Sequence, residues 1–259
     1  MLTRRVIVCL DVKGARVVKG VKFEGLRDVG DPVALSARYE REGADEITFL
    51  DISASAEERA TLLDVARRTA ERLFIPLTIG GGVRTSDDVA RALRAGADKV
   101  SMNSAIVTRP DLLTEAADRF GAQCVVASID AKRDAHGVYK VWVKGGREET
   151  PLDAVAWAQE CVARGAGEIL LTSIDRDGAR TGYDLSITRA VATAVHVPVI
   201  ASGGAGIAHH LVDGIVQGGA DAVLVAGILH DGVTTVQALK HLMSEAGLPV
   251  RVTTTGADA

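Results

Sequence analysis

Apolar runs and amphipathic segments alternate along the whole chain. The amphipathic segments repeat their apolar residues at helical spacing, as 86–95 and 154–164 illustrate. Continuous apolar runs between helices are typical of parallel strands buried on both faces. The predicted strands are the eight runs 6–10, 46–50, 76–79, 98–102, 123–129, 168–174, 198–202 and 221–226. Eight such units predict an α/β fold, a single (β/α)8 TIM barrel with its active site at the carboxyl ends of the strands.

The second half of the chain repeats the first. Residues 76–106 and 198–229 each contain a strand that starts at proline, a glycine cluster, a helical stretch and Gly-Ala-Asp before the next strand. The same offset carries Glu46 onto Glu168, and it is far longer than the roughly 20–50 residues of a solenoid repeat. We therefore expect two duplicated half-barrels, about 1–122 and 123–246, followed by a C-terminal tail, 247–259. Their pseudo-twofold axis would place paired ligand sites across one mouth.

Composition narrows the class of protein. The chain has 259 residues, is 47% hydrophobic and carries a net charge of −4, which suits one globular domain. No apolar run approaches the roughly 18 residues of a membrane span, and the start leads directly into a strand rather than a signal peptide. We expect a cytoplasmic protein without membrane or nucleic-acid partners, since aromatic residues are only 3% and the charge is acidic. The three cysteines lack CxxC spacing and suit reduced packing positions.

Polar or glycine residues follow nearly every predicted strand. Because the carboxyl ends of barrel strands share one mouth, these residues should form a ring around it. They are Asp11, Asp51, Gly80-Gly81-Gly82, Asn103-Ser104, Asp130, Asp175, Ser202-Gly203-Gly204 and Ala226-Gly227. Glycine clusters let backbone N–H groups and helix N-termini close on a phosphate, although a single cluster would equally suit a tight turn. Their duplication predicts two phosphate sites.

Asp11 and Asp130 are the candidate acid–base pair. They end strands one and five, which face each other across an eight-stranded barrel. General acid–base catalysis near pH 7 needs one protonated and one ionised group, so burial or neighbours must raise at least one pKa from about 3.9. The alternative is that either aspartate only forms a loop turn.

Two further features are placed at opposite ends of the predicted barrel. The connections 12–31 and 131–151 are unusually long, equivalent in the two halves, and candidate lids, and 138–143 alternates like a hairpin strand. At the other end, charged residues stand at or near the starts of strands one, two, four and six. These residues, which should converge at the bottom of the barrel, are Arg5, Glu46, Lys99 and Glu168. A ring of salt bridges is their simplest interpretation.

The motifs resemble one enzyme family from end to end. VCLDVKGARVVKG (8–20), IGGGVR (79–84), SIDAKR (128–133), GAGEILLTSIDRDG (165–178) and IASGGAG (200–206) are similar to the cyclase subunit of imidazole glycerol phosphate synthase. The resemblance implies an ammonia-dependent lyase of histidine biosynthesis that needs no cofactor or metal. It converts phosphoribulosyl-formimino aminoimidazole carboxamide ribotide to imidazole glycerol phosphate and aminoimidazole carboxamide ribotide.

The resemblance also implies a partner, and two alternatives remain open. A glutaminase subunit supplies the ammonia in this family, as the other half of a heterodimer. The phosphoribosyl-formimino aminoimidazole carboxamide ribotide isomerase shares the duplicated barrel and its phosphate sites, but CLDV and LLTSIDRDG are the cyclase versions of these segments. A non-catalytic phosphosugar-binding barrel is the third possibility, and the two aspartates argue against it.

Residue roles carry over onto matching positions. The resemblance implies Asp11 and Asp130 as the catalytic pair and Lys19 as a mobile lysine that contacts the bis-phosphate substrate. It implies a first phosphate site at Gly82, Asn103 and Ser104 and a second at Asp177, Gly178, Gly203, Gly204, Ala226 and Gly227, with Asp51, Thr172 and Ser202 completing the substrate-binding set. The basal ring Arg5, Glu46, Lys99 and Glu168 becomes an ammonia gate, and Asp98 a contact to the glutaminase.

The chain departs from the family pattern in three places. The glycine of the first long loop is shifted to Gly14-Ala15, Pro151 stands where glycine is usual, and Gly227 replaces a serine of the second phosphate site. The last change removes a hydroxyl donor but leaves the backbone N–H. No departure removes a proposed catalytic group.

Overall fold

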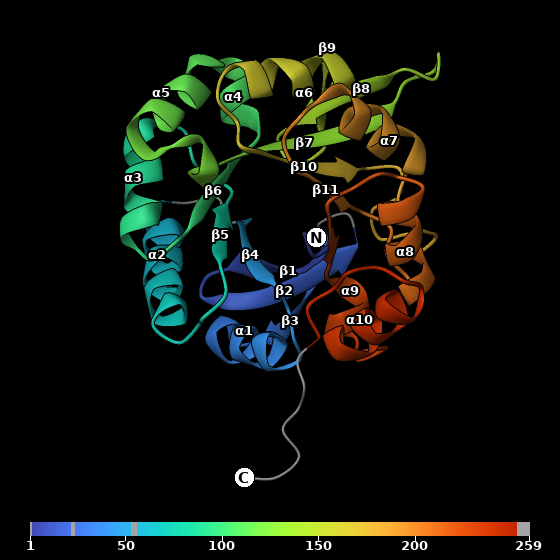
Figure 1. Ribbon diagram of the computed structural model, residues 1–259. Helices are drawn as coiled ribbons and strands as arrows, with labels where there is room; N and C mark the ends of the chain where they lie inside the picture. The colour runs from blue at the N-terminus through green and yellow to red at the C-terminus, as the bar shows by residue number, and fades with distance from the viewer. Residues whose placement is uncertain (1, 22–23, 53–55, 253–259) are drawn as a thin grey trace.

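A computed structural model describes residues 2–21, 24–52 and 56–252. Parallel strands within these ranges close into a barrel, because β10 pairs with β7 as well as with β11 (Figure 1). In order around the barrel they are β1 (Arg5–Lys13), β4 (Glu46–Asp51), β5 (Leu77–Gly80), β6 (Lys99–Met102), β7 (Val125–Arg133), β10 (Glu168–Ser173), β11 (Val199–Ser202) and β12 (Ala222–Val225). The predicted TIM barrel and its eight strands are confirmed.

Helices surround the barrel on its outside (Figure 1). They are α1 (Pro32–Arg41), α2 (Ala56–Ala70), α3 (Ser86–Arg94), α4 (Ser104–Thr108), α5 (Asp111–Phe120), α6 (Ala154–Ala163), α7 (Leu185–Ala194), α8 (Ala208–Val216), α9 (Gly227–His230) and α10 (Val236–Glu245), with a 3-10 turn at Ala122–Cys124. Asp31, Thr85, Asp153, Asp184 and Thr235 begin five of them by accepting a hydrogen bond from a first-turn backbone N–H. None of the described helices is both long and apolar enough to cross a membrane.

The strands bury apolar side chains on both faces. Val6, Val8 and Leu10 of β1 pack outward against the helices, whereas Ile7 and Cys9 join Leu170 in a smaller cluster inside the barrel. Because side chains alternate along a strand, Arg5 and Asp11 share the inward face with Ile7 and Cys9. The same period places Glu168 and Thr172 on the inward face of β10. The inner apolar cluster therefore separates a charged end of the barrel from the mouth.

Both long connections form antiparallel hairpins that extend barrel strands. The first is β2 (Arg16–Val21) with β3 (Glu24–Gly30), where no strand was predicted. The second is β8 (Tyr139–Val143) with β9 (Glu148–Asp153), and β8 confirms the strand expected at 138–143. β2 pairs with the end of β1 from Asp11↔Val18, and β8 pairs with the end of β7 from Asp130↔Trp142. The two halves thus repeat their hairpins as well as their barrel strands.

The repeated Gly-Ala-Asp sequence ties neighbouring strands together at their starts. Asp45 accepts a hydrogen bond from the Val6 backbone at 2.8 Å, and Asp98 accepts one from Leu77 at 2.8 Å. Asp221 accepts one from Val199 at 3.2 Å. The equivalent position before β10 is Gly167, where a Cβ atom would lie 2.2 Å from the Ala122 carbonyl oxygen. A close contact between the Gly167 and Ala122 backbones therefore takes the place of the aspartate hydrogen bond at this position.

The chain after α10 returns to the foot of the barrel. Val250 forms a parallel bridge with Arg4, and the Arg4 N–H donates to the Pro249 carbonyl at 2.6 Å. Lys240, only 2% exposed, donates to the Asp45 carboxylate at 2.6 Å and to the Arg251 carbonyl at 2.9 Å. The first part of the segment expected as a tail, 248–251, packs against the barrel, and 253–259 lie outside the described residues.

Candidate active site

Asp11 and Asp130 occupy equivalent positions at the mouth. Asp11 lies beside Val18 of β2 and Leu50 of β4, and Asp130 lies beside Trp142 of β8 and Thr172 of β10. Each is therefore held between a barrel strand and a hairpin strand, both carboxylates are half-buried, and side-chain alternation turns both inward. Such a position is regular strand rather than a loop turn, which argues against the turn-forming alternative.

The surroundings raise the pKa of both carboxyl groups. Burial raises the pKa of Asp11 to about 6, while the Lys19 ammonium lowers it and the Asp177 carboxylate raises it. Burial, with a further contribution from Asp177, raises the pKa of Asp130 to about 7. Lys19 lowers the pKa of Asp11 and not that of Asp130, which explains why Asp11 has the lower pKa. Near neutral pH, Asp130 therefore keeps its proton more readily than Asp11.

One cavity of about 860 Å³ is lined by the residues of the predicted second phosphate site. Its lining includes Lys19 and the set Asp177, Gly178, Ser202, Gly203, Gly204, Ala226 and Gly227. Gly204 has φ +108°, and a Cβ there would lie 2.2 Å from the Gly182 carbonyl oxygen. Only glycine fits that approach without strain. The predicted residues from β10, β11 and β12 are thus brought together around one space.

The predicted first phosphate residues lie outside that cavity, around the ends of β5 and β6. Asn103 precedes α4 and donates through Nδ2 to the Ser128 carbonyl at 3.2 Å. The Ser104 hydroxyl donates to Asn103 Oδ1 at 3.0 Å and accepts the Lys144 N–H at 2.9 Å. Gly82 has φ +65°. The β8–β9 turn therefore lies over this site, where the Lys144 backbone N–H donates a hydrogen bond to the Ser104 hydroxyl oxygen.

The two remaining predicted substrate residues lie on the strands next to those of the catalytic candidates, since β4 pairs with β1 and β10 pairs with β7. Asp51 ends β4 and is buried beside Val12 of β1. Thr172 is half-buried in β10, in register with Asp130 on one side and Ser202 on the other. Thr172 is thus placed between the catalytic candidate and the cavity.

Four charged or polar residues in the cavity were missed by sequence reasoning. They are Arg27, Arg180, His230 and Asp231. Arg27 of β3 and Arg180 of the β10–α7 loop both form ion pairs with the Asp231 carboxylate. This bridge holds the β2–β3 hairpin against the opposite rim of the cavity. Arg27 and Arg180 lie in or beside the long connections and strand ends noted above, but nothing local marks their meeting.

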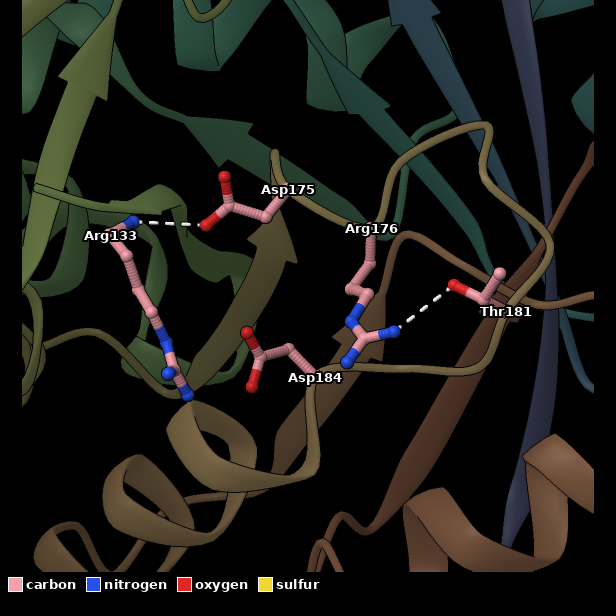
Figure 2. A pocket seen from close by; sticks show the side chains of 5 residues that line it. All are labelled: Arg133, Asp175, Arg176, Thr181 and Asp184. Carbon is pink, nitrogen blue, oxygen red and sulfur yellow. Dashed lines mark hydrogen bonds between the residues drawn. The ribbon is translucent and has the colours of Figure 1, made fainter. Parts of the chain in front are cut away.

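A smaller cavity of about 460 Å³ lies beside the ends of β7 and β10. Figure 2 shows its lining, Arg133, Asp175, Arg176, Thr181 and Asp184. The Arg133 backbone N–H donates to Asp175 at 3.0 Å, and the Arg176 guanidinium donates to Thr181 at 3.1 Å. Asp184 accepts the Tyr139 hydroxyl at 2.8 Å and begins α7. Its polar side chains make hydrogen bonds within the wall, and the cavity brings together no substrate residue predicted from the sequence.

The four charged residues at the strand starts meet in a closed ring. Lys99 Nζ lies 2.8 Å from both Glu46 and Glu168, and Arg5 also pairs with both carboxylates. Glu46 and Glu168 are 2% and 5% exposed, so neither charge could stand unpaired. The Thr78 hydroxyl donates a further hydrogen bond to the Glu46 carboxylate at 2.5 Å. The predicted convergence of these residues at the bottom of the barrel is observed.

Asp98 stands next to this ring at the same end of the barrel. It is exposed, and one of its carboxylate oxygens accepts the Leu77 N–H. An exposed carboxylate held in place by a backbone hydrogen bond suits a surface contact. Across the described ranges, no group of three or more His, Cys, Asp or Glu side chains is arranged to hold a metal ion.

Comparison with known proteins gives one consistent result. The family described as "Histidine biosynthesis protein" matches residues 5–235. The chain is 74% identical over 251 residues to "Imidazole glycerol phosphate synthase subunit HisF" of Myxococcus xanthus (strain DK1622), which covers 97% of this chain and 99% of that one. It is 57% identical over 253 residues to the protein of the same name from Gluconacetobacter diazotrophicus, with 98% of each chain covered.

Proposed function

This chain belongs to the family of the imidazole glycerol phosphate synthase subunit HisF, and on that premise we propose how its barrel performs the cyclase reaction of histidine biosynthesis. The reaction closes an imidazole ring with ammonia and cleaves phosphoribulosyl-formimino aminoimidazole carboxamide ribotide. Its products are imidazole glycerol phosphate and aminoimidazole carboxamide ribotide. The names of the relatives give no support to the isomerase alternative.

Asp11 and Asp130 divide the proton transfers between them. The observation that carries this assignment is their equivalent register at opposite sides of one mouth, each with a raised pKa. Asp11, with the lower pKa, is ionised first and acts as the base that takes a proton from the attacking nitrogen. Asp130, with the pKa near 7, acts as the acid that donates to the leaving part of the substrate. Burial keeps the two pKa values above those of free carboxyl groups, and the Asp177 carboxylate adds to the effect.

The bis-phosphate substrate spans the mouth between two cradles. One phosphate binds in the cavity beside Gly204 and Gly227, where Lys19 faces Gly227: a Cβ at Gly227 would lie 3.5 Å from Lys19 Cε. The other binds beside Gly82, Asn103 and Ser104, with the Ser104 hydroxyl turning its hydrogen from Asn103 Oδ1 toward the phosphate. Binding at both ends would place the reacting carbons between the two aspartates.

Ammonia enters from the opposite end in our proposal. The relatives are named as a subunit, which implies a partner, and we infer that this partner is a glutaminase docked near Asp98. The ring of Arg5, Glu46, Lys99 and Glu168 would part to admit ammonia, which crosses the inner apolar cluster toward Asp11. A neutral molecule passes such a layer far more easily than an ammonium ion. We assign the reaction to the cytoplasm.

The direct test is product formation by the purified protein. Incubation with the bis-phosphate substrate and an ammonium salt should give imidazole glycerol phosphate in proportion to free ammonia. The ribosyl isomer, which the isomerase would use, should give no ring product under the same conditions. Absence of ring closure with the ribulosyl substrate, or turnover of the ribosyl isomer alone, would contradict the proposal.

A further inference from the structure

His230 stands at the end of the helix that begins in the phosphate cavity. α9 is four residues long, with Gly227 at its start in the cavity and His230 at its end. His230 Nε2 lies 3.0 Å from the Cys9 carbonyl oxygen, and Nδ1 lies 2.7 Å from the Tyr39 hydroxyl. A carbonyl only accepts, so Nε2 carries the hydrogen and Nδ1 accepts from the tyrosine. One neutral imidazole therefore links α9, β1 and α1.

The Cys9 carbonyl lies in a gap between two ladders. β12 pairs with β1 only as far as Val8↔Val225, and the hairpin strand β2 begins to pair at Asp11↔Val18. Backbone groups of alternate residues point to the same side of a strand, so the Cys9 carbonyl points to the edge of β1 that pairs with β12 before this residue and with β2 after it. At Cys9 itself neither strand pairs with this edge. The imidazole N–H takes the place of the missing backbone donor. Without it, a buried carbonyl would have no partner at this point.

The gap lies two residues before Asp11. Cys9 and Asp11 share the inward face of β1, and the Cys9 thiol lies 3.9 Å from an Asp11 carboxylate oxygen. Any displacement of the β1 backbone at Cys9 would therefore move the Asp11 carboxylate. Tyr39, which is fully buried in α1, in turn fixes the imidazole ring. Burial, helped by the positive charges of Lys19, Arg38 and Arg27 and opposed by the hydrogen bond to Cys9, lowers the pKa of His230 to about 4.

We infer that His230 is a positioning residue that holds the end of β1, and with it the Asp11 carboxylate, in register with the phosphate cavity. This inference rests on the proposed role of Asp11. Helix α9 then has two roles, since its first residue lines the cradle and its last residue supports the catalytic strand. A phosphate bound at Gly227 and the orientation of Asp11 are thereby tied to one rigid helical turn.

The test compares two replacements of the histidine. His230→Leu keeps the volume but removes the donor, whereas His230→Gln can place an amide N–H near the Nε2 position. We expect His230→Leu to lower kcat with ammonium salts by about 10-fold or more and to change KM by less than about threefold, because binding is retained while orientation is lost. His230→Gln should recover kcat to within about threefold of wild type.

Tyr183→Phe is the matched control. The Tyr183 hydroxyl donates to the Leu224 carbonyl of β12 at 3.0 Å, so its loss also strips a buried strand carbonyl of a side-chain donor, but on the neighbouring strand. We expect its kcat to stay near wild type. The apparent pKa on the acidic side of the kcat–pH profile should shift in His230→Leu, because this replacement alters the surroundings of Asp11. The same apparent pKa should stay at its wild-type value in Tyr183→Phe.

Two results would overturn the inference. One is an equal kcat for His230→Leu and His230→Gln; the other is a parallel loss in Tyr183→Phe, which would reduce the effect to general stability. Asp11→Asn separates this failure from a failure of the proposed function. An inactive Asp11→Asn with a normal His230→Leu would refute the role of His230 alone, and an active Asp11→Asn would refute the acid–base assignment itself.

Discussion

Asp11 and Asp130 are each the first residue of a barrel strand to pair with an antiparallel hairpin strand. A barrel strand and a hairpin strand hold the backbone of each aspartate, and each carboxylate is half-buried. Because the two half-barrels repeat this arrangement, the pair faces one mouth from equivalent positions. Their pKa values nevertheless differ, since Lys19 lies near Asp11. A duplicated scaffold thus yields two carboxyl groups with different roles.

Replacing either aspartate by asparagine should stop proton transfer while preserving size. We expect Asp11→Asn and Asp130→Asn each to lower the ammonia-dependent rate by roughly 100-fold or more, with circular dichroism unchanged. Asp175→Asn is the control, because Asp175 is another carboxylate at the mouth but is exposed. Near-normal rates in both variants would show that neither group transfers the proton.

The raised pKa values also predict how stability depends on pH. The folded protein holds the Asp130 proton up to a pH of about 7, whereas the unfolded chain releases it near 4, so the free energy of unfolding should fall as the pH rises between these values. Asp130→Asn removes this penalty. We expect the variant to gain up to about 4 kcal/mol over wild type at pH 8, and little at pH 4, in urea unfolding. A gain independent of pH would contradict the assigned pKa.

The serine-to-glycine departure at the second phosphate site can be reversed. A Cβ at Gly227 would meet the end of the flexible Lys19 side chain at ordinary contact distance, so Gly227→Ser fits. Its hydroxyl would add one donor to the cradle. We expect KM for the bis-phosphate substrate to fall by about two- to fivefold with kcat little changed. Steady-state kinetics beside Gly227→Ala separate the hydroxyl from the added carbon, and equal KM values for the two variants would argue against a phosphate at this position.

The basal ring predicts a difference between two nitrogen sources. With the glutaminase partner present, Lys99→Ala and Asp98→Ala should lose about 10-fold or more of the glutamine-driven rate but less than about threefold of the rate with ammonium salt, because added ammonia reaches the mouth directly. Arg68→Ala, at an exposed arginine of α2 on the outside of the barrel, should affect neither rate. Unfolding of Lys99→Ala must be measured in parallel, since Glu46 and Glu168 lose a partner. Equal losses with both sources would leave the ring as a purely structural feature.

The barrel was predictable from sequence because its signals are local. Each buried strand is a short apolar run, and its polar or glycine end marks the mouth, which placed Asp11, Asp130 and the glycine-rich strand ends of the large cavity. The β2–β3 hairpin was not predicted, because its polar residues gain strand structure by pairing with the end of β1. Helix α9 was likewise too short to show helical periodicity.

Contacts between distant residues were beyond the reach of local patterns. Arg27 and Asp231 are 204 positions apart, and His230 meets Cys9 across 221 positions. Each residue in isolation looks like an ordinary surface charge or a helix-end histidine. Only closure of the barrel between β1 and β12 brings them together. The duplicated halves gave no help, because the Arg27–Asp231–Arg180 bridge involves the hairpin of the first half alone.

The bridge between Arg4 and Val250 puts the beginning and the end of the described part of the chain side by side. A short linker between them would therefore turn the protein into a covalent circle that the fold already accommodates. New ends cut at the exposed turn between the half-barrels, near Ala122, would give a circular permutant whose gene encodes the second half-barrel first. In such a permutant, Asp130 would be synthesised before Asp11, yet both would return to the same mouth.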